Sequence, residues 1–197
     1  MLNYENAGKT IKTATPKSAD TDEWDVKVGD PIDYFDPSLS YELTGYRPIT
    51  KDRGLDFDPA PFMVAAETYR REGKYTALIP GTFKHRNHWV QEFNKCLHGV
   101  TIGKYRITGE HYFFLNYYRL LSVLGTKSGD EVRQEDFPGF LAKQYEYFHY
   151  LELARKSGHD VCVFKCRGIG FSEMIASNLA HAFTFHKASK SIVAAAA

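Results

Sequence analysis

Residues 161–172 read VCVFKCRGIGFS, and this stretch decides which fold the sequence predicts. It begins with a short apolar, β-branched run at residues 161–164, which is typical of a buried strand. Two glycines, Gly168 and Gly170, follow in a loop, and Ser172 opens a segment whose apolar residues have helical spacing. A glycine loop between a strand and a helix presents backbone N–H groups to an anion, and the helix dipole adds to their field. The stretch therefore predicts a phosphate site.

The segments on either side of this loop predict an alternation of helices and strands. Upstream, Asp136 is a suitable N-cap for a long helix, and Gly158 is a suitable end for it. Downstream, a second apolar run occupies residues 191–194. The order helix, strand, loop, helix, strand over residues 136–197 predicts a parallel sheet and an α/β fold that is incomplete in this chain.

The region before residue 136 predicts an irregular α+β organisation in two parts. Residues 1–60 are turn-rich and acidic and predict a flexible arm, whereas residues 61–135 predict an accessory region. The elements expected there are a short helix at 61–73, a helix at 86–99, a hairpin at 100–108, an aromatic segment at 109–123 that can begin as a helix and end as a strand, and a polar loop at 125–135.

Composition excludes several classes of protein. The 197 residues are 43% hydrophobic and 15% aromatic, which argues against a wholly disordered chain. No apolar run approaches the roughly 20 residues that cross a bilayer, and three cysteines do not make a disulfide scaffold. The net charge of +1 hides an asymmetry, because residues 1–60 carry 12 acidic and 7 basic side chains (−5) and residues 61–197 carry 12 and 18 (+6). The basic remainder is compatible with binding phosphates or nucleic acid.

The loop departs from the usual phosphate-loop pattern G-x-x-x-x-G-K-[ST]. Phe171 stands where the lysine is expected, and Lys165 stands where the first glycine is expected. The physical roles are still available, since Gly170 lets the backbone approach a phosphate and Ser172 can place its hydroxyl on Mg²⁺. Lys165 or Arg167 can supply the positive charge. The alternative is a plain turn whose glycines only allow a positive φ.

With its lysine at the first position and an aromatic residue before the serine, the loop resembles the deviant Walker A motif of large terminase subunits. These are the ATPase motors that package DNA into the capsids of tailed phages and related viruses. Three upstream stretches also resemble that family: WVQEF at 89–93, GEHYFFLNY at 109–117 and QYEYF at 144–148. The resemblance covers roughly residues 80–197.

The resemblance implies a P-loop NTPase (RecA/ASCE-like) fold, a parallel sheet with flanking helices, that binds ATP and Mg²⁺. Lys165 would be the relocated lysine, Arg167 would sense or stabilise the γ-phosphate, and Ser172 would bind Mg²⁺. Gln144 would read the adenine edge, or else bind a neighbouring backbone group. The residues expected to hold the phosphates are Lys165, Cys166, Arg167, Gly168, Ile169, Gly170, Phe171 and Ser172.

The function that the resemblance implies is that of the N-terminal part of a viral terminase large subunit, which hydrolyses ATP to package double-stranded DNA. The implied partners are double-stranded DNA, the portal protein, the small terminase subunit and further copies of the chain, in the host cytoplasm and without a membrane. Only Glu173 is acidic after Ser172, so this fragment lacks the carboxylates that hydrolysis needs and is expected to be inactive alone. The alternatives are a fragment of a helicase-like ATPase and a non-catalytic adaptor.

Other motifs carry weaker hypotheses. Residues 8–10 read GKT without a preceding apolar strand, so we attribute this match to chance. The Tyr-rich stretch 112–118 could stack on bases, but an aromatic core is the better interpretation. A zinc site is conceivable from four side chains whose spacing matches no common zinc finger, namely those of His85, His88, Cys96 and His98.

Overall fold

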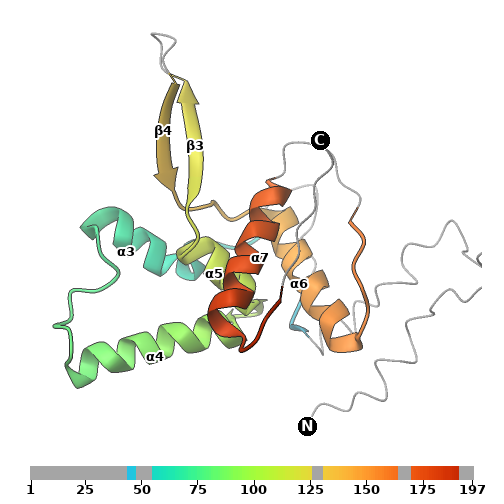
Figure 1. Cartoon of the computed structure of the whole chain (residues 1–197), viewed down its shortest axis with the longest axis horizontal. Helices are drawn as coiled ribbons and strands as arrows, with labels where there is room; N and C mark the ends of the chain where they lie inside the picture. The colour runs from blue at the N-terminus through green and yellow to red at the C-terminus, as the bar shows by residue number, and fades with distance from the viewer. Residues whose placement is uncertain (1–43, 48–54, 126–130, 164–169, 191–197) are drawn as a thin grey trace, which may run out of the picture.

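The computed structural model describes residues 44–47, 55–125, 131–163 and 170–190 (Figure 1). Its elements are, in chain order, the 3₁₀-helix η3 (Ala60–Phe62), α3 (Val64–Glu72), α4 (Phe83–His98), β1 (Val100–Ile102), β2 (Tyr105–Ile107), α5 (Gly109–Asn116), β3 (Leu120–Gly125), β4 (Glu131–Asp136), α6 (Ala142–Ser157) and α7 (Phe171–Phe185).

The short helix α5 lies at the centre of the helices and contacts α3, α4, α6 and α7 (Figure 1). Seven of its eight residues are buried, and they include the polar side chains of Glu110, His111 and Asn116. Gly109 at its start lies against α4, since a Cβ there would be 2.1 Å from the carbonyl oxygen of Cys96. The glycine is therefore required for the close approach of α4 and α5.

The strands form two separate antiparallel pairs. β1 pairs with β2, with Val100 opposite Ile107, and β3 pairs with β4, with Leu120 opposite Asp136. The β3–β4 hairpin extends away from the helices (Figure 1). No parallel pair of strands occurs in the described residues, so the predicted α/β fold with a P-loop parallel sheet is wrong for this part of the chain.

The strand expected at residues 161–164 explains this error. Residues 161–163 have no strand conformation, and Val163 is 38% exposed. A β-branched run forms a strand only where a neighbouring strand accepts its backbone hydrogen bonds, and the described residues supply none. The second run, at 191–194, lies outside the described residues.

The long helix begins later than its sequence signals predict. Asp136 does not cap it but ends β4, and its carboxylate accepts hydrogen bonds from the Arg70 side chain and the Phe137 backbone N–H, both at 2.7 Å. The polar loop expected at 125–135 is likewise wrong where residues 131–135 belong to β4. Alternation in the sequence EVRQED is weak, so the strand is visible only through its pairing with β3.

Other expected elements are confirmed. The helices near 61–73 and 86–99 exist as α3 and α4, and the hairpin at 100–108 forms from β1 and β2. The segment at 109–123 begins as helix α5 and ends in strand β3. Gly158 closes α6 in the left-handed conformation, with a φ of 72°. No described helix has the length and apolarity to cross a membrane.

One cluster of buried side chains joins the described segments. It is largely aromatic, as the composition suggests, and includes one residue of α7. Its buried members are Tyr46, Phe62, Cys96, Tyr105, Ile107, Tyr112, Phe114, Leu115, Phe140, Tyr145, Phe148 and Met174. The helix that follows the glycine loop is therefore packed on the same core as the accessory region.

Glu92 supplies a buried charge inside this aromatic core. Its carboxylate accepts hydrogen bonds from the hydroxyls of Tyr112 and Tyr117, both at 2.6 Å, and from Lys95 at 2.5 Å. Burial alone would raise the pKa of Glu92, but these donors outweigh it and hold the pKa below its usual value. Tyr112 and Tyr117 are thus core residues, which agrees with the aromatic-core interpretation of the Tyr-rich stretch.

Candidate functional site

The start of α7 is the described part of the predicted phosphate site. Gly170 is its N-cap in the left-handed conformation, with a φ of 69°, and its carbonyl accepts from the N–H groups of Glu173 (3.1 Å) and Met174 (3.2 Å). No described side chain caps this helix start. Gly170 is exposed, and a Cβ added to it would meet nothing within 4 Å. No described residue therefore lies against Gly170 on the side where a Cβ would be.

Three of the other described α-helices differ at their starts, because a side-chain oxygen accepts from one or two of the first N–H groups of each. Thr82 serves α4 and Thr108 serves α5, each at 3.2 Å. Asn116 serves α3 by accepting from two consecutive N–H groups at 3.1 Å. At α6, Gln144 accepts instead from the N–H of Leu141, the residue before the helix, at 3.1 Å, so no described side chain caps the first N–H groups of α6. The first N–H groups of a helix have no partner within it, and among the described α-helices no side chain engages those of α6 and α7. Of these two starts, only that of α7 follows an exposed glycine.

Phe171 has a structural reason to occupy the position where a phosphate loop usually has lysine. Its ring packs edge-on against Tyr147 of α6, with the centroids 5.1 Å apart, and it borders the buried cluster. This contact anchors the first turn of α7. Ser172, the next residue, is exposed in that turn.

An acidic residue also lies in the first turn of α7. Glu173 accepts a hydrogen bond at 2.8 Å from the hydroxyl of Tyr118, which lies two residues after α5. Burial, together with this carboxylate, raises the pKa of Tyr118 to about 12, so the hydroxyl stays protonated. The bond holds Glu173 beside the helix start, where its charge would oppose an anion.

The predicted site residues are only partly described. Lys165, Cys166, Arg167, Gly168 and Ile169 lie outside the described residues. Gly170, Phe171 and Ser172 are consecutive at the start of α7.

Gln144, the remaining predicted site residue, is buried in the first turn of α6, three residues before the Tyr147 that contacts Phe171. Its side-chain oxygen accepts from the backbone N–H of Leu141, which is the neighbouring-backbone role given above as the alternative. Its role at the adenine edge stays a prediction.

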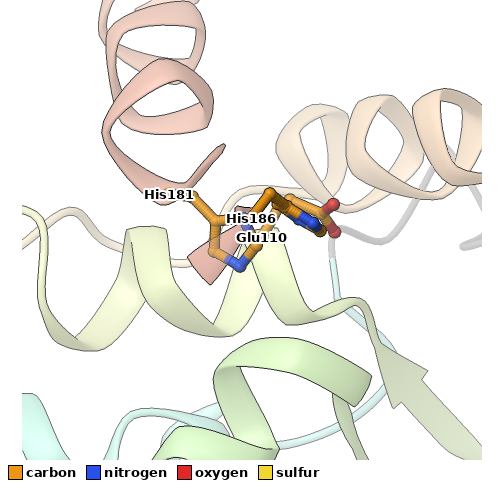
Figure 2. Close-up of side chains that lie close together, drawn as sticks. All are labelled: Glu110, His181 and His186. Carbon is orange, nitrogen blue, oxygen red and sulfur yellow. The ribbon is translucent and has the colours of Figure 1, made fainter. Parts of the chain in front are cut away.

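A second cluster was not predicted from the sequence. Glu110, His181 and His186 each offer a ligand atom, and these atoms all lie within 4.8 Å of one another (Figure 2). Glu110 comes from the first turn of α5, His181 from the last part of α7, and His186 is the residue that caps the end of α7. The fold brings together residues 71 positions apart, and the only sequence signal is a histidine pair near a helix end.

Hydrogen bonds fix two of the three side chains. His181 is buried, and its Nε2 lies 2.7 Å from the carbonyl oxygen of Cys96. Because a carbonyl oxygen only accepts, Nε2 carries the proton and Nδ1 keeps its lone pair. Burial lowers the pKa of His181, which favours the neutral ring. Glu110 is buried and its carboxylate oxygen Oε1 accepts from Arg155, whereas His186 is exposed.

The conceivable zinc set from the sequence does not assemble in the described residues, where Glu110, His181 and His186 are the only such group. The Nε2 of His85 accepts a hydrogen bond from the Trp89 indole at 3.0 Å. Burial raises the pKa of Cys96 to about 12, with Glu92 adding to the shift, so the thiol of the chain without metal is protonated.

Comparisons of the chain with protein-family models, with curated proteins and with solved structures find no match.

Proposed function

We propose that this chain binds the phosphates of ATP·Mg²⁺ through residues 165–172, at the start of α7. The observation that supports the proposal most is the difference between helix starts. At α3, α4 and α5 a side-chain oxygen engages one or two of the first N–H groups of the helix, whereas the glycine-led start of α7 has no such cap among the described residues. Free N–H groups at the positive end of a helix dipole favour a bound phosphate.

The residues around this start supply the remaining chemistry. Gly170 permits close approach of the backbone, and the exposed hydroxyl of Ser172 can bind Mg²⁺. Lys165 and Arg167 bring two positive charges to the phosphates. Gln144 keeps its role at the adenine edge through its amide nitrogen, because the bond to Leu141 uses its oxygen.

The setting we propose is the nucleotide-binding part of a DNA-packaging motor of the large-terminase type. This extension rests on the resemblance of the loop and of the upstream aromatic stretches. Double-stranded DNA, the portal protein, the small terminase subunit and other copies of the chain are the partners that it implies. Hydrolysis also requires carboxylates for Mg²⁺ and for the attacking water, so the proposal for this chain alone is binding.

The adaptor interpretation is the second candidate. It is favoured by the absence of parallel strands in the described residues and by the left-handed φ of Gly170, which a plain turn also needs. The two candidates differ in one measurable property, since an adaptor has no saturable affinity for ATP.

Fluorescence anisotropy with a labelled ATP and Mg²⁺ tests the proposal. We expect saturable binding by the wild-type chain and a loss of at least about tenfold in Lys165→Ala, because one charge-assisted contact to phosphate contributes roughly 1.5–3 kcal/mol. Lys84→Ala is the matched control, since Lys84 lies in the first turn of α4, a helix start that Thr82 caps.

Equal affinities of Lys165→Ala and the wild type would overturn the role of Lys165. The absence of saturable binding in the wild type would favour the adaptor.

A further inference from the structure

We propose that Glu110, His181 and His186 form a site for a divalent transition-metal ion, with Zn²⁺ as the ion that their chemistry fits best. The cluster lies where the end of α7 meets the start of α5 (Figure 2). It is separate from the phosphate site, which occupies the opposite end of α7. Nothing in the ATP proposal requires it.

Two imidazoles and one carboxylate are a ligand set that zinc accepts. Such sets leave a fourth position for water in a tetrahedral arrangement. Hard cations such as Mg²⁺ prefer oxygen ligands throughout, so two nitrogen ligands favour a transition metal. The two nitrogen donors and one oxygen donor therefore favour a transition-metal ion over Mg²⁺.

The spacing of the ligand atoms is close to what a metal needs. Ligands about 2.1 Å from a tetrahedral zinc ion lie roughly 3.4 Å from one another, and here the largest separation is 4.8 Å or less. A shift of about 1.4 Å would close that difference. His186 can supply it, because it is exposed and follows the last residue of α7.

The two buried ligands already have the outer partners that orient metal ligands. Metal-bound histidines usually donate their second ring N–H to a carbonyl or carboxylate, and Nε2 of His181 donates to the carbonyl of Cys96. This bond leaves Nδ1 as the ligand atom. No described residue donates a hydrogen bond to it.

Arg155 is the cation that competes for Glu110. It donates to Oε1, and no described residue donates to the other carboxylate oxygen. One oxygen can stay with Arg155 while the other binds the metal, and the arginine side chain is 53% exposed and can also move into solvent. The ion pair is therefore compatible with the site and resembles the outer partner of a ligating carboxylate.

Isothermal titration of the full chain with ZnCl₂ tests this site. We expect one saturable ion per chain and a loss of affinity of at least about tenfold in His186→Ala. His98→Ala is the matched control, because His98 is also an exposed histidine at a helix end, here that of α4. Both variants change exposed residues and should fold as the wild type does.

Two further readouts separate a built site from general affinity of histidines for zinc. Co²⁺ should give visible absorption bands of a four-coordinate ion in the wild type and in His98→Ala, but not in His186→Ala. Zn²⁺ should raise the melting temperature of the wild type and of His98→Ala, but not that of His186→Ala. Equal affinity of His186→Ala and His98→Ala, or no saturable binding by the wild type, would overturn the proposal.

Discussion

The starts of α5 and α7 differ in what their backbone polar groups meet. At α5, Thr108 accepts from the N–H of His111, and Gly109 is pressed against the carbonyl of Cys96. At α7, a Cβ on Gly170 would meet no described atom within 4 Å, and no described side chain caps the helix. The first N–H groups of α5 therefore include one that a side chain engages, whereas no described side chain engages those of α7.

The same contrast extends to the side chains. Around α5, Glu92 is satisfied by two tyrosines and a lysine, and Asn116 makes hydrogen bonds with four backbone groups. At the end of α7, Nδ1 of His181 is without a described donor. Glu92 and Asn116 thus use their polar atoms to hold the core around α5, whereas the two candidate sites lie at the two ends of α7.

The largest expected effect is that of removing the Asn116 side chain. Its Oδ1 accepts from the N–H groups of Ala65 and Ala66, and its Nδ2 donates to the carbonyls of Phe62 and Tyr112. Asn116→Ala should lower the free energy of unfolding by about 3–5 kcal/mol, because each buried backbone group left unpaired costs about 1–3 kcal/mol. Urea denaturation followed by circular dichroism measures the change.

Asn94→Ala is the control for this prediction, because Asn94 is exposed on α4. It should change the free energy of unfolding by less than about 0.5 kcal/mol. A similar loss of unfolding free energy in both variants would contradict the stabilising role assigned to the hydrogen bonds of Asn116.

The next effect is a dependence of stability on pH that arises beside α5. Burial is the main cause that lowers the pKa of His149 to about 4 and that of His111 well below its usual value. Below pH 6.5 the unfolded chain therefore takes up protons that the folded chain does not. Stability should fall by about 2–3 kcal/mol from His149 alone between pH 7 and pH 4.

Urea denaturation at a series of pH values measures this loss. His149→Phe should flatten the dependence of the unfolding free energy on pH between pH 6.5 and pH 4, since Nε2 of His149 is buried without a partner. His98→Ala, which changes an exposed histidine, should leave this dependence unchanged. Carboxylates whose pKa values are lowered, such as Glu92, reduce the stability only at lower pH, below about 4.5. An unchanged slope in His149→Phe would contradict the assignment.

The smallest expected effect concerns Glu173 at the start of α7. Glu173→Gln removes a negative charge from the first turn and should raise the affinity for ATP roughly two- to fivefold. The same anisotropy titration measures it, with Glu146→Gln on the exposed face of α6 as the control. Weaker binding by Glu173→Gln would show that the phosphates do not approach this turn.

Much of the local structure was predictable from the sequence, and the long-range pairing was not. Glycine stops and aromatic spacing located α3, α4, α5 and the end of α6, because these signals act over a few residues. The β3–β4 hairpin and the absence of a strand at 161–163 depend on partners that are distant in sequence. Asp136 was expected to cap a helix, but Arg70, 66 positions earlier, binds it at the end of β4.

Of the two candidate sites, one was predictable from the local sequence and the other was not. The start of α7 at Gly170 and Ser172 was predictable because a local pattern marks it. The cluster of Glu110, His181 and His186 was not, because only the packing of α7 on α5 brings the carboxylate to the histidines.

Residue-resolved NMR of the backbone amides during titration with ATP·Mg²⁺ tests the central claim most directly. We predict the largest chemical-shift changes at Gly170, Phe171 and Ser172, with saturation at one common affinity. The amides at the starts of α4 and α5, next to Thr82 and Thr108, should not move. Changes of equal size at those starts, or none at the start of α7, would contradict the proposal that this helix start binds phosphate.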